Sequence, residues 1–255
     1  MNTSSEVRSS LPGHSTGNDS TPPAEKGDLA ILFGVIFQPQ AAFHVLALKP
    51  RWLLPMTACL ILSLASVTLI VNRMGMANMM RSALQGNPRA EEIAQKTEES
   101  SFARTMIYAS PLVQLPIVVA VMAGVFLLVF MLAGVDVSFK QAFSIVIHAL
   151  FAYSVIATTL ILVTVYATKD FTGFDIRNPI ATNVGFFLDP AETSKFLYSL
   201  TSSLDVLSFW FLYLLAVGFA GTSPKVRFQK TLPLIVVVWF FYAIGKAAFS
   251  VVLGR

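Results

Sequence analysis

Five long apolar stretches, separated by polar segments, dominate the hydrophobic pattern of the chain. Each holds about 17 to 25 residues, which at a rise of about 1.5 Å per residue matches a hydrocarbon core about 30 Å thick. Backbone groups in lipid must be satisfied within the segment, and the short alternating pattern of a barrel strand is missing, so helices are expected. The stretches run over residues 52–71, 112–133, 143–167, 204–220 and 232–253. The predicted fold is all-α, an integral membrane bundle of five transmembrane helices, with one membrane domain over residues 52–254.

The polar segment before the first stretch divides into two parts. Residues 1–27 are rich in Ser, Thr, Pro, Gly and Asn and contain no apolar core, so they are predicted to form a disordered polar tail rather than a cleavable signal peptide. Residues 28–51 hold two short segments, too short to span, and Pro39 opens the second. Phe43, Leu46 and Ala47 would share one helix face, which favours short amphipathic helices at the membrane interface.

The loops carry local helix patterns. Met74, Met76, Met79 and Met80 invite a soft-metal interpretation such as Cu(I), but no Cys or His stands nearby, so helical continuation of the first span is the preferred interpretation. Asn87 and Pro88 favour a helix start, with Glu92 and Lys96 as an i, i+4 pair. Asp189-Pro190-Ala191-Glu192 has the pattern of another helix start in the long loop over residues 168–203.

Composition supports a membrane protein and argues against nucleic-acid binding. Charged residues make up 13% of the 255 residues and hydrophobic ones 55%, against roughly 25% charged in soluble domains. The formal net charge is +4, yet the basic residues are scattered over the loops without interleaved aromatics. The expected partners are the lipid bilayer and, through the tail or loops, other proteins. The single cysteine, Cys59, is most simply a small buried hydrophobe.

Two further features bear on assembly and orientation. Ala120 and Gly124 have a small-xxx-small spacing, for which packing within the monomer is preferred over a homo-oligomer, although the latter stays open. Positive charges near span ends divide almost evenly between the two sides and do not decide the topology. The three basic residues in the loop over residues 221–231 favour a cytoplasmic N-terminus.

Three side chains within the five stretches can carry charge near neutral pH: His148, Asp205 and Lys246. The fourth and fifth stretches are antiparallel, which places Asp205 and Lys246 in the same half of the bilayer. They are candidates for an intramembrane polar site, since an unpaired charge at depth is costly. The alternatives are that they pair to lock two helices, or that Lys246 snorkels to the surface. His148, beside a run of hydroxyl residues, either relays protons or bonds to a neighbouring segment.

Enzyme and cofactor chemistry have no positive support in the chain. It contains no HExxH sequence and no Walker A loop, and the three histidines, His14, His44 and His148, lie in different regions. No catalytic residue, metal site or cofactor is therefore predicted.

Two segments resemble the bacterial branch of the Yip family, the Ypt/Rab-interacting membrane proteins. Ser203-Leu-Asp205-Val-Leu-Ser-Phe-Trp210, continuing through Leu214-Leu-Ala-Val-Gly218-Phe-Ala, is similar to the fourth span of that family. Phe37-Gln-Pro39 to Lys49-Pro50-Arg-Trp52 is similar to the entry into its first span. The likeness covers about residues 37–254.

The resemblance implies a five-span scaffold with a cytoplasmic tail, in the inner membrane of a bacterium, and a membrane-organising role. Eukaryotic members are associated with Rab-type GTPases, but their DLYGP and GYG motifs are not found here, so GTPase binding and site residues are not carried over. The leading hypothesis is a non-enzymatic membrane scaffold. A small transporter or channel component that uses His148, Asp205 and Lys246 is the alternative, and an enzyme or assembly factor acting through the loop over residues 168–203 is the third.

Overall fold

The computed structural model describes residues 27–85, 87–189, 192–222 and 226–252. Over these residues the chain forms ten α-helices, one short 3-10 helix and no strand, which confirms the all-α prediction. The expected tail, residues 1–27, lies outside the described residues except for Gly27. The helices are α1 (Asp28–Phe37), α2 (Pro39–Leu48), α3 (Leu53–Met74), α4 (Met76–Ala83), α5 (Ala90–Glu99), α6 (Ser101–Leu132), α7 (Phe139–Ala167), η1 (Val184–Phe187), α8 (Lys195–Thr201), α9 (Val206–Ala220) and α10 (Phe228–Val252).

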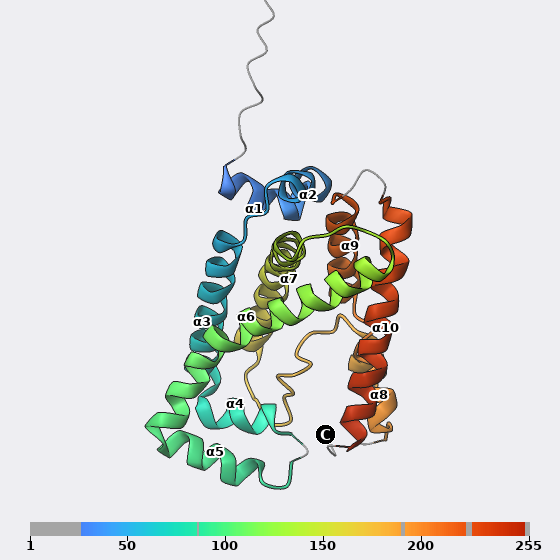
Figure 1. Cartoon of the computed structure of the whole chain (residues 1–255). Helices are drawn as coiled ribbons and strands as arrows, with labels where there is room; N and C mark the ends of the chain where they lie inside the picture. The colour runs from blue at the N-terminus through green and yellow to red at the C-terminus, as the bar shows by residue number, and fades with distance from the viewer. Residues whose placement is uncertain (1–26, 86, 190–191, 223–225, 253–255) are drawn as a thin grey trace, which may run out of the picture.

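Helix α7 is the centre of the bundle. It packs against α3, α6 and α9, and α10 in turn packs against α9 and α8 (Figure 1). Its apolar residues are buried on all sides near its start, with Ile145, Val146 and Ile147 fully inaccessible. A helix that is apolar around its whole circumference belongs in the middle of a bundle, since no face is left for water.

Helices α1 and α2 lie across one end of the bundle, above the starts of α3 and α7 (Figure 1). Ser144 on α7 holds this end in place, because its Oγ accepts from the Arg51 backbone N–H at 3.2 Å and donates to the Arg51 carbonyl at 2.6 Å. Gln141 Nε2 donates to the Ala47 carbonyl at 2.8 Å. The predicted apolar face of α2 is real, but Phe43 and Leu46 are fully buried against the bundle.

Within the part of the chain that the structure describes, four helices are long and apolar enough to cross a membrane: α3, α6, α7 and α10. The membrane bundle is thus confirmed, but the fourth expected span is shorter than predicted. Helix α9 has 15 residues, about 22 Å by helical rise. The physical reason is Asp205, whose carboxylate accepts from the Leu207 N–H at 3.2 Å and caps the helix. Apolar composition alone counted Leu204 and Asp205 as part of the span.

The other spans differ from expectation at their ends. Helix α6 begins at Ser101, well before the expected Leu112, because the Ser100 side chain accepts from the Ala103 N–H and starts the helix among polar residues. Pro111 and Pro116 lie inside it. Gly75, with φ 82°, ends α3, so the expected helical continuation through the methionines was wrong and α4 is a separate helix.

Two further local predictions were wrong. Open space surrounds the Cβ position of Gly124, so the Ala120–Gly124 pair does not provide close packing within the monomer there; Ala123 is the buried small residue on that helix. Helix α8 begins at Lys195, where the Ser194 side chain accepts from the Leu197 N–H, and not at Asp189. Pro190 and Ala191 lie outside the described residues. The Glu92–Lys96 ion pair, at 2.5 Å, is present as predicted.

Candidate functional site

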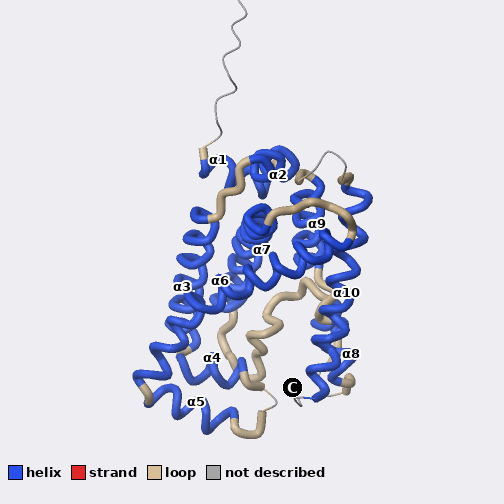
Figure 2. The backbone as a smooth tube through the Cα atoms, in the orientation of Figure 1, coloured by secondary structure: helices blue, strands red, loops and turns tan. Residues whose placement is uncertain are grey.

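The short α9 stands on a loop that enters the bundle. Figure 2 shows the chain after α7 rising from the end of the molecule where α4 and α5 lie and reaching the foot of α9. Two backbone hydrogen bonds fix it there, from Val184 N–H to the Leu204 carbonyl at 3.2 Å and from Val206 N–H to the Thr182 carbonyl at 3.0 Å. Non-helical backbone at membrane depth is tolerated where it is buried in protein or lines a cavity.

Packing of this loop is close. Gly185 is buried, and a Cβ added to it would overlap Ser202 Oγ and lie 2.8 Å from the Ser202 backbone nitrogen. Asn183, 8% exposed, donates through Nδ2 to Asn178 Oδ1 at 2.5 Å and accepts through Oδ1 from the Phe186 N–H at 2.9 Å. Asn178 Nδ2 in turn donates to the Tyr198 hydroxyl at 3.2 Å. The loop is therefore a fixed part of the bundle wall.

A cavity of about 270 Å³ lies between this loop and helices α7, α9 and α10. Asp205 and Lys246, two of the three predicted site residues, both line it. The other lining residues come from the loop, from α7 and from the facing sides of α9 and α10: Tyr153, Ala157, Ile161, Arg177, Asn178, Pro179, Ile180, Thr182, Asn183, Ser202, Ser203, Leu207, Ser208, Trp239 and Tyr242.

Lys246 does not form the direct ion pair with Asp205 that one hypothesis proposed. Among the described residues no such pair exists; the Lys246 ammonium donates to Ser203 Oγ at 3.3 Å. The Asp205 carboxylate accepts from the Leu207 N–H and from Ser208 Oγ, the latter at 3.3 Å. The two opposite charges thus share one cavity while each is held by its own neighbours.

Arg177 adds a second cation to the cavity wall. Its Nε and Nη2 donate to the two oxygens of Asp175, both at 2.9 Å, in the bidentate arrangement favoured by guanidinium and carboxylate. In the structure Arg177 and Asn178 line the same cavity as Asp205 and Lys246.

His148 is not part of this cavity. It is 2% exposed, and its Nδ1 lies 2.8 Å from the Ser144 carbonyl oxygen, one turn back on α7. Because a carbonyl only accepts, Nδ1 carries the proton. Hydroxyl residues of α7 also form hydrogen bonds within their own helix, since Thr159 and Thr164 each donate to a carbonyl one turn back. Of the hydroxyl residues on α7, only Tyr153 lines the cavity.

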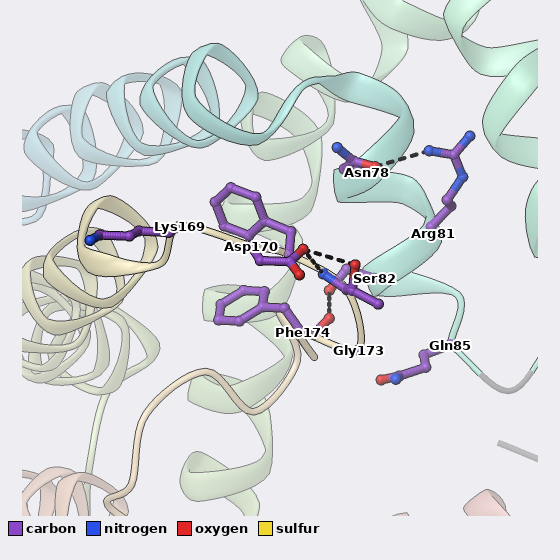
Figure 3. A pocket seen from close by; sticks show the side chains of 10 residues that line it. Asn78, Arg81, Ser82, Gln85, Lys169, Asp170, Gly173 and Phe174 are labelled. Atoms are coloured by element: carbon purple, nitrogen blue, oxygen red, sulfur yellow. Dashed lines mark hydrogen bonds between the residues drawn. The ribbon is translucent and has the colours of Figure 1, made fainter.

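A second, larger hollow of about 560 Å³ lies at the surface between α4 and the turn after α7 (Figure 3). Asp170 caps this turn by accepting from the backbone and hydroxyl of Thr172, and these hydrogen bonds lower the pKa of its carboxyl. Ser82 Oγ donates to the Phe174 carbonyl and so joins α4 to the turn. Figure 3 shows Lys169 pointing away from Arg81, so the two cations do not converge on a common point.

The residues that sequence reasoning missed are mostly neutral ones. Ser203, Ser208, Trp239 and Tyr242 carried no distinctive spacing, and only folding brings them to the cavity. The Asn178-Pro179 pair is a sequence signal that could have indicated an ordered turn in this loop and so pointed to the cavity wall. Within the described residues there is no group of three or more His, Cys, Asp or Glu side chains that could hold a metal ion.

A family model described as the Yip1 domain matches residues 33–252. The chain belongs to the Yip1 family. The match runs from the second turn of α1 to the end of α10 and so includes every residue of the cavity. This Yip1 protein is a multi-pass membrane protein, as the resemblance implied. No curated protein and no solved structure matches it.

Proposed function

We propose that this Yip1 protein is a non-enzymatic membrane-organising protein that acts through α1 and α2 at the membrane interface. The observation that carries the proposal is an exposed apolar stripe on α1. Leu29, Phe33 and Phe37 recur every fourth residue and are 62%, 55% and 78% exposed, while Ile31 and Val35 on the opposite face are buried. Apolar side chains exposed as a stripe, with their helix fixed to a bundle, are typical of insertion among lipid head groups.

The anchoring of α1 and α2 supports this role. Arg51 forms an ion pair with Asp28 at the start of α1, and Ser144 binds the Arg51 backbone, so both helices are connected to the central helix α7. A wedge that displaces lipids must be held rigidly, since a loose helix would follow the lipids instead of ordering them. The proposed location is the inner membrane of a bacterium with the N-terminus in the cytoplasm, and protein partners would meet the tail or the loops.

Reconstitution into vesicles tests the proposal. The wild-type protein at rising protein-to-lipid ratio is expected to shift the vesicle size distribution seen by cryo-electron microscopy. Replacing Phe33 and Phe37 together with serine removes two of the three apolar side chains of the exposed stripe and is expected to abolish the shift. Phe187→Ser is the matched control, because Phe187 is equally exposed, at 76%, but lies on η1 in the long loop. An unchanged shift in the double variant would contradict the proposal.

Transport is a second candidate, favoured by the cavity that reaches Lys246. A dry, tightly packed bundle would have argued against it. Proteoliposomes loaded with a panel of small anions, cations and amino acids test this candidate directly. Flux that depends on the protein and disappears in Lys246→Met supports transport, whereas vesicles as tight as protein-free controls for the whole panel contradict it.

A further inference from the structure

The cavity between α7, α9, α10 and the loop is lined by a cation with unused hydrogen-bond donors and by an anion with unused hydrogen-bond acceptors. An ammonium group has three donors, and Lys246 uses one of them, toward Ser203 Oγ. A carboxylate can accept about four hydrogen bonds, and Asp205 accepts two. Two opposite charges that face one cavity without contacting each other leave a place for a ligand that itself carries both charges.

The cavity lies beside an exposed, largely apolar surface of α10. Of its lining residues, Lys246 and Tyr242 are exposed on the outer surface of α10, Tyr242 by 63%. Their neighbours on that surface are apolar, with Phe241 70% and Phe249 61% exposed. The polar cavity is therefore bordered by a surface suited to acyl chains.

The position along α10 fits the head-group region of one leaflet. Lys246 is six residues before Val252, the last described residue of the helix, or about 9 Å by helical rise. Helix α10 is 25 residues long, about 37 Å, which exceeds a hydrocarbon core of about 30 Å. The cavity therefore lies near the boundary between the hydrocarbon core of the bilayer and the head groups of one leaflet, at the end of the molecule where α8 packs on α10.

We propose that this cavity binds the phosphoethanolamine head group of a phospholipid. Lys246 donates to the phosphate, as does Nη1 of Arg177, the guanidinium nitrogen that does not bind Asp175. The Asp205 carboxylate accepts from the primary ammonium of the ethanolamine. The cavity volume of about 270 Å³ equals that of roughly nine waters, which suits a head group of similar size. A quaternary ammonium cannot donate to Asp205, and a glycerol head group carries no positive charge, so choline and glycerol lipids bind less well.

Native mass spectrometry of the purified full chain in nanodiscs tests this proposal. The protein is offered an equimolar mixture of phosphatidylethanolamine, phosphatidylglycerol and phosphatidylcholine with identical acyl chains. Wild-type protein is expected to retain phosphatidylethanolamine in preference to the other two. Equal retention of the three lipids overturns the proposal, and this measurement needs no variant that has to fold.

Substitutions of Lys246 and Asp205 test which part of the head group each residue binds. Lys246→Met is expected to lower phosphatidylethanolamine retention about ten-fold, the effect of losing one hydrogen bond to a charged group. Asp205→Asn still caps α9, since asparagine is a good N-cap, and is expected to lose the preference for ethanolamine over glycerol lipids. Lys169→Met is the matched control, an exposed lysine at the same end but outside the cavity. Retention equal in Lys246→Met and Lys169→Met overturns the proposal.

A final binding experiment distinguishes a lipid ligand from a soluble phosphate ester. Inorganic phosphate and glycerophosphoethanolamine are added to lipid-depleted protein in detergent, and bound mass is measured. The proposal expects both to bind far more weakly than the lipid, because they lack acyl chains to contact the outer surface of α10. If either binds as tightly as phosphatidylethanolamine, the ligand is a soluble phosphate ester and the lipid assignment is wrong.

Discussion

At the residue scale, Gly218 on α9 lies where α2 and α7 approach this helix closely. A Cβ there would overlap the Ile145 side chain and lie 3.1 Å from the Phe43 ring. Gly218→Val is expected to lower the free energy of unfolding by about 1–3 kcal/mol, because overpacking in a close-packed core forces neighbours to shift. The midpoint of thermal unfolding in a fixed detergent measures this effect.

Gly245→Ala is the control for this substitution. It also replaces a helical glycine, but nothing lies within 4 Å of the added Cβ on α10. Its unfolding midpoint should match or slightly exceed that of the wild type, since alanine is the better helix former. If Gly218→Val were as stable as Gly245→Ala, the close approach of α2 to α9 would be wrong.

Thr231 also has a specific structural role. It is fully buried and its hydroxyl donates to the Ala216 carbonyl at 2.9 Å, which joins α10 to α9. Thr231→Val is expected to cost about 1 kcal/mol of unfolding free energy, the usual value of such a bond in a membrane bundle. Thr159→Val is compared with it, because Thr159 donates within its own helix. Equal losses would show that the contact between helices adds nothing.

At the element scale, α4 and α5 form a helix pair joined by charge. The Arg81 guanidinium binds both oxygens of Glu91, at 2.7 and 2.8 Å, and its hydrogen bonds lower the pKa of the Glu91 carboxyl. A lowered folded-state pKa means that this stabilisation is fully present above the ordinary pKa of 4.5 and is lost as pH falls through the folded value.

Hydrogen exchange of α5 measures this pH dependence. At pH 7, Glu91→Gln is expected to exchange faster than the wild type in α5, and the difference should disappear as the pH falls below about 4.5 and Glu91 becomes protonated. High salt should reduce it as well, because both side chains are exposed. A difference that persists unchanged in acid would show that the ion pair does not hold the two helices together.

At the scale of the whole molecule, the arrangement of helices predicts which loops share a side of the membrane. Lys140 is the second residue of α7, next to Gln141, which contacts Ala47 of α2, and Lys169 lies two residues beyond the other end of α7 at Ala167. Cysteine introduced at each position should react with an impermeant maleimide from opposite sides of the membrane. Native Cys59 is buried in α3 and should stay unlabelled.

With the proposed orientation, position 140 is labelled only from the cytoplasmic side and position 169 only from the other. The reverse pattern would leave the fold intact and overturn the cytoplasmic N-terminus. Labelling of both positions from one side would contradict α7 as a span. The positive charges could not decide this question, because they are divided almost evenly between the two ends.

The sequence predicted the helices far better than it predicted the contacts between side chains and backbone that set the helix ends. The short helices α1 and α2 match the apolar run and the Pro39 start closely, and the long apolar runs mark α3, α6, α7 and α10. Where a polar side chain acts on the backbone, the boundaries moved: Asp205 shortened α9 and Ser100 lengthened α6. Apolar composition records which segments avoid water, but it does not record which side chain satisfies a helix end.

By itself, the sequence determined that the chain is a helical membrane protein, because apolar runs of membrane length have few other stable states. It also predicted that Asp205 and Lys246 lie in the same half of the bilayer. Only the tertiary structure decided that they face a shared cavity, that His148 lies apart from it, and that the long loop is hydrogen-bonded to the start of α9. Hydrophobicity is a property of each segment, whereas a cavity depends on distances between segments that no single segment encodes.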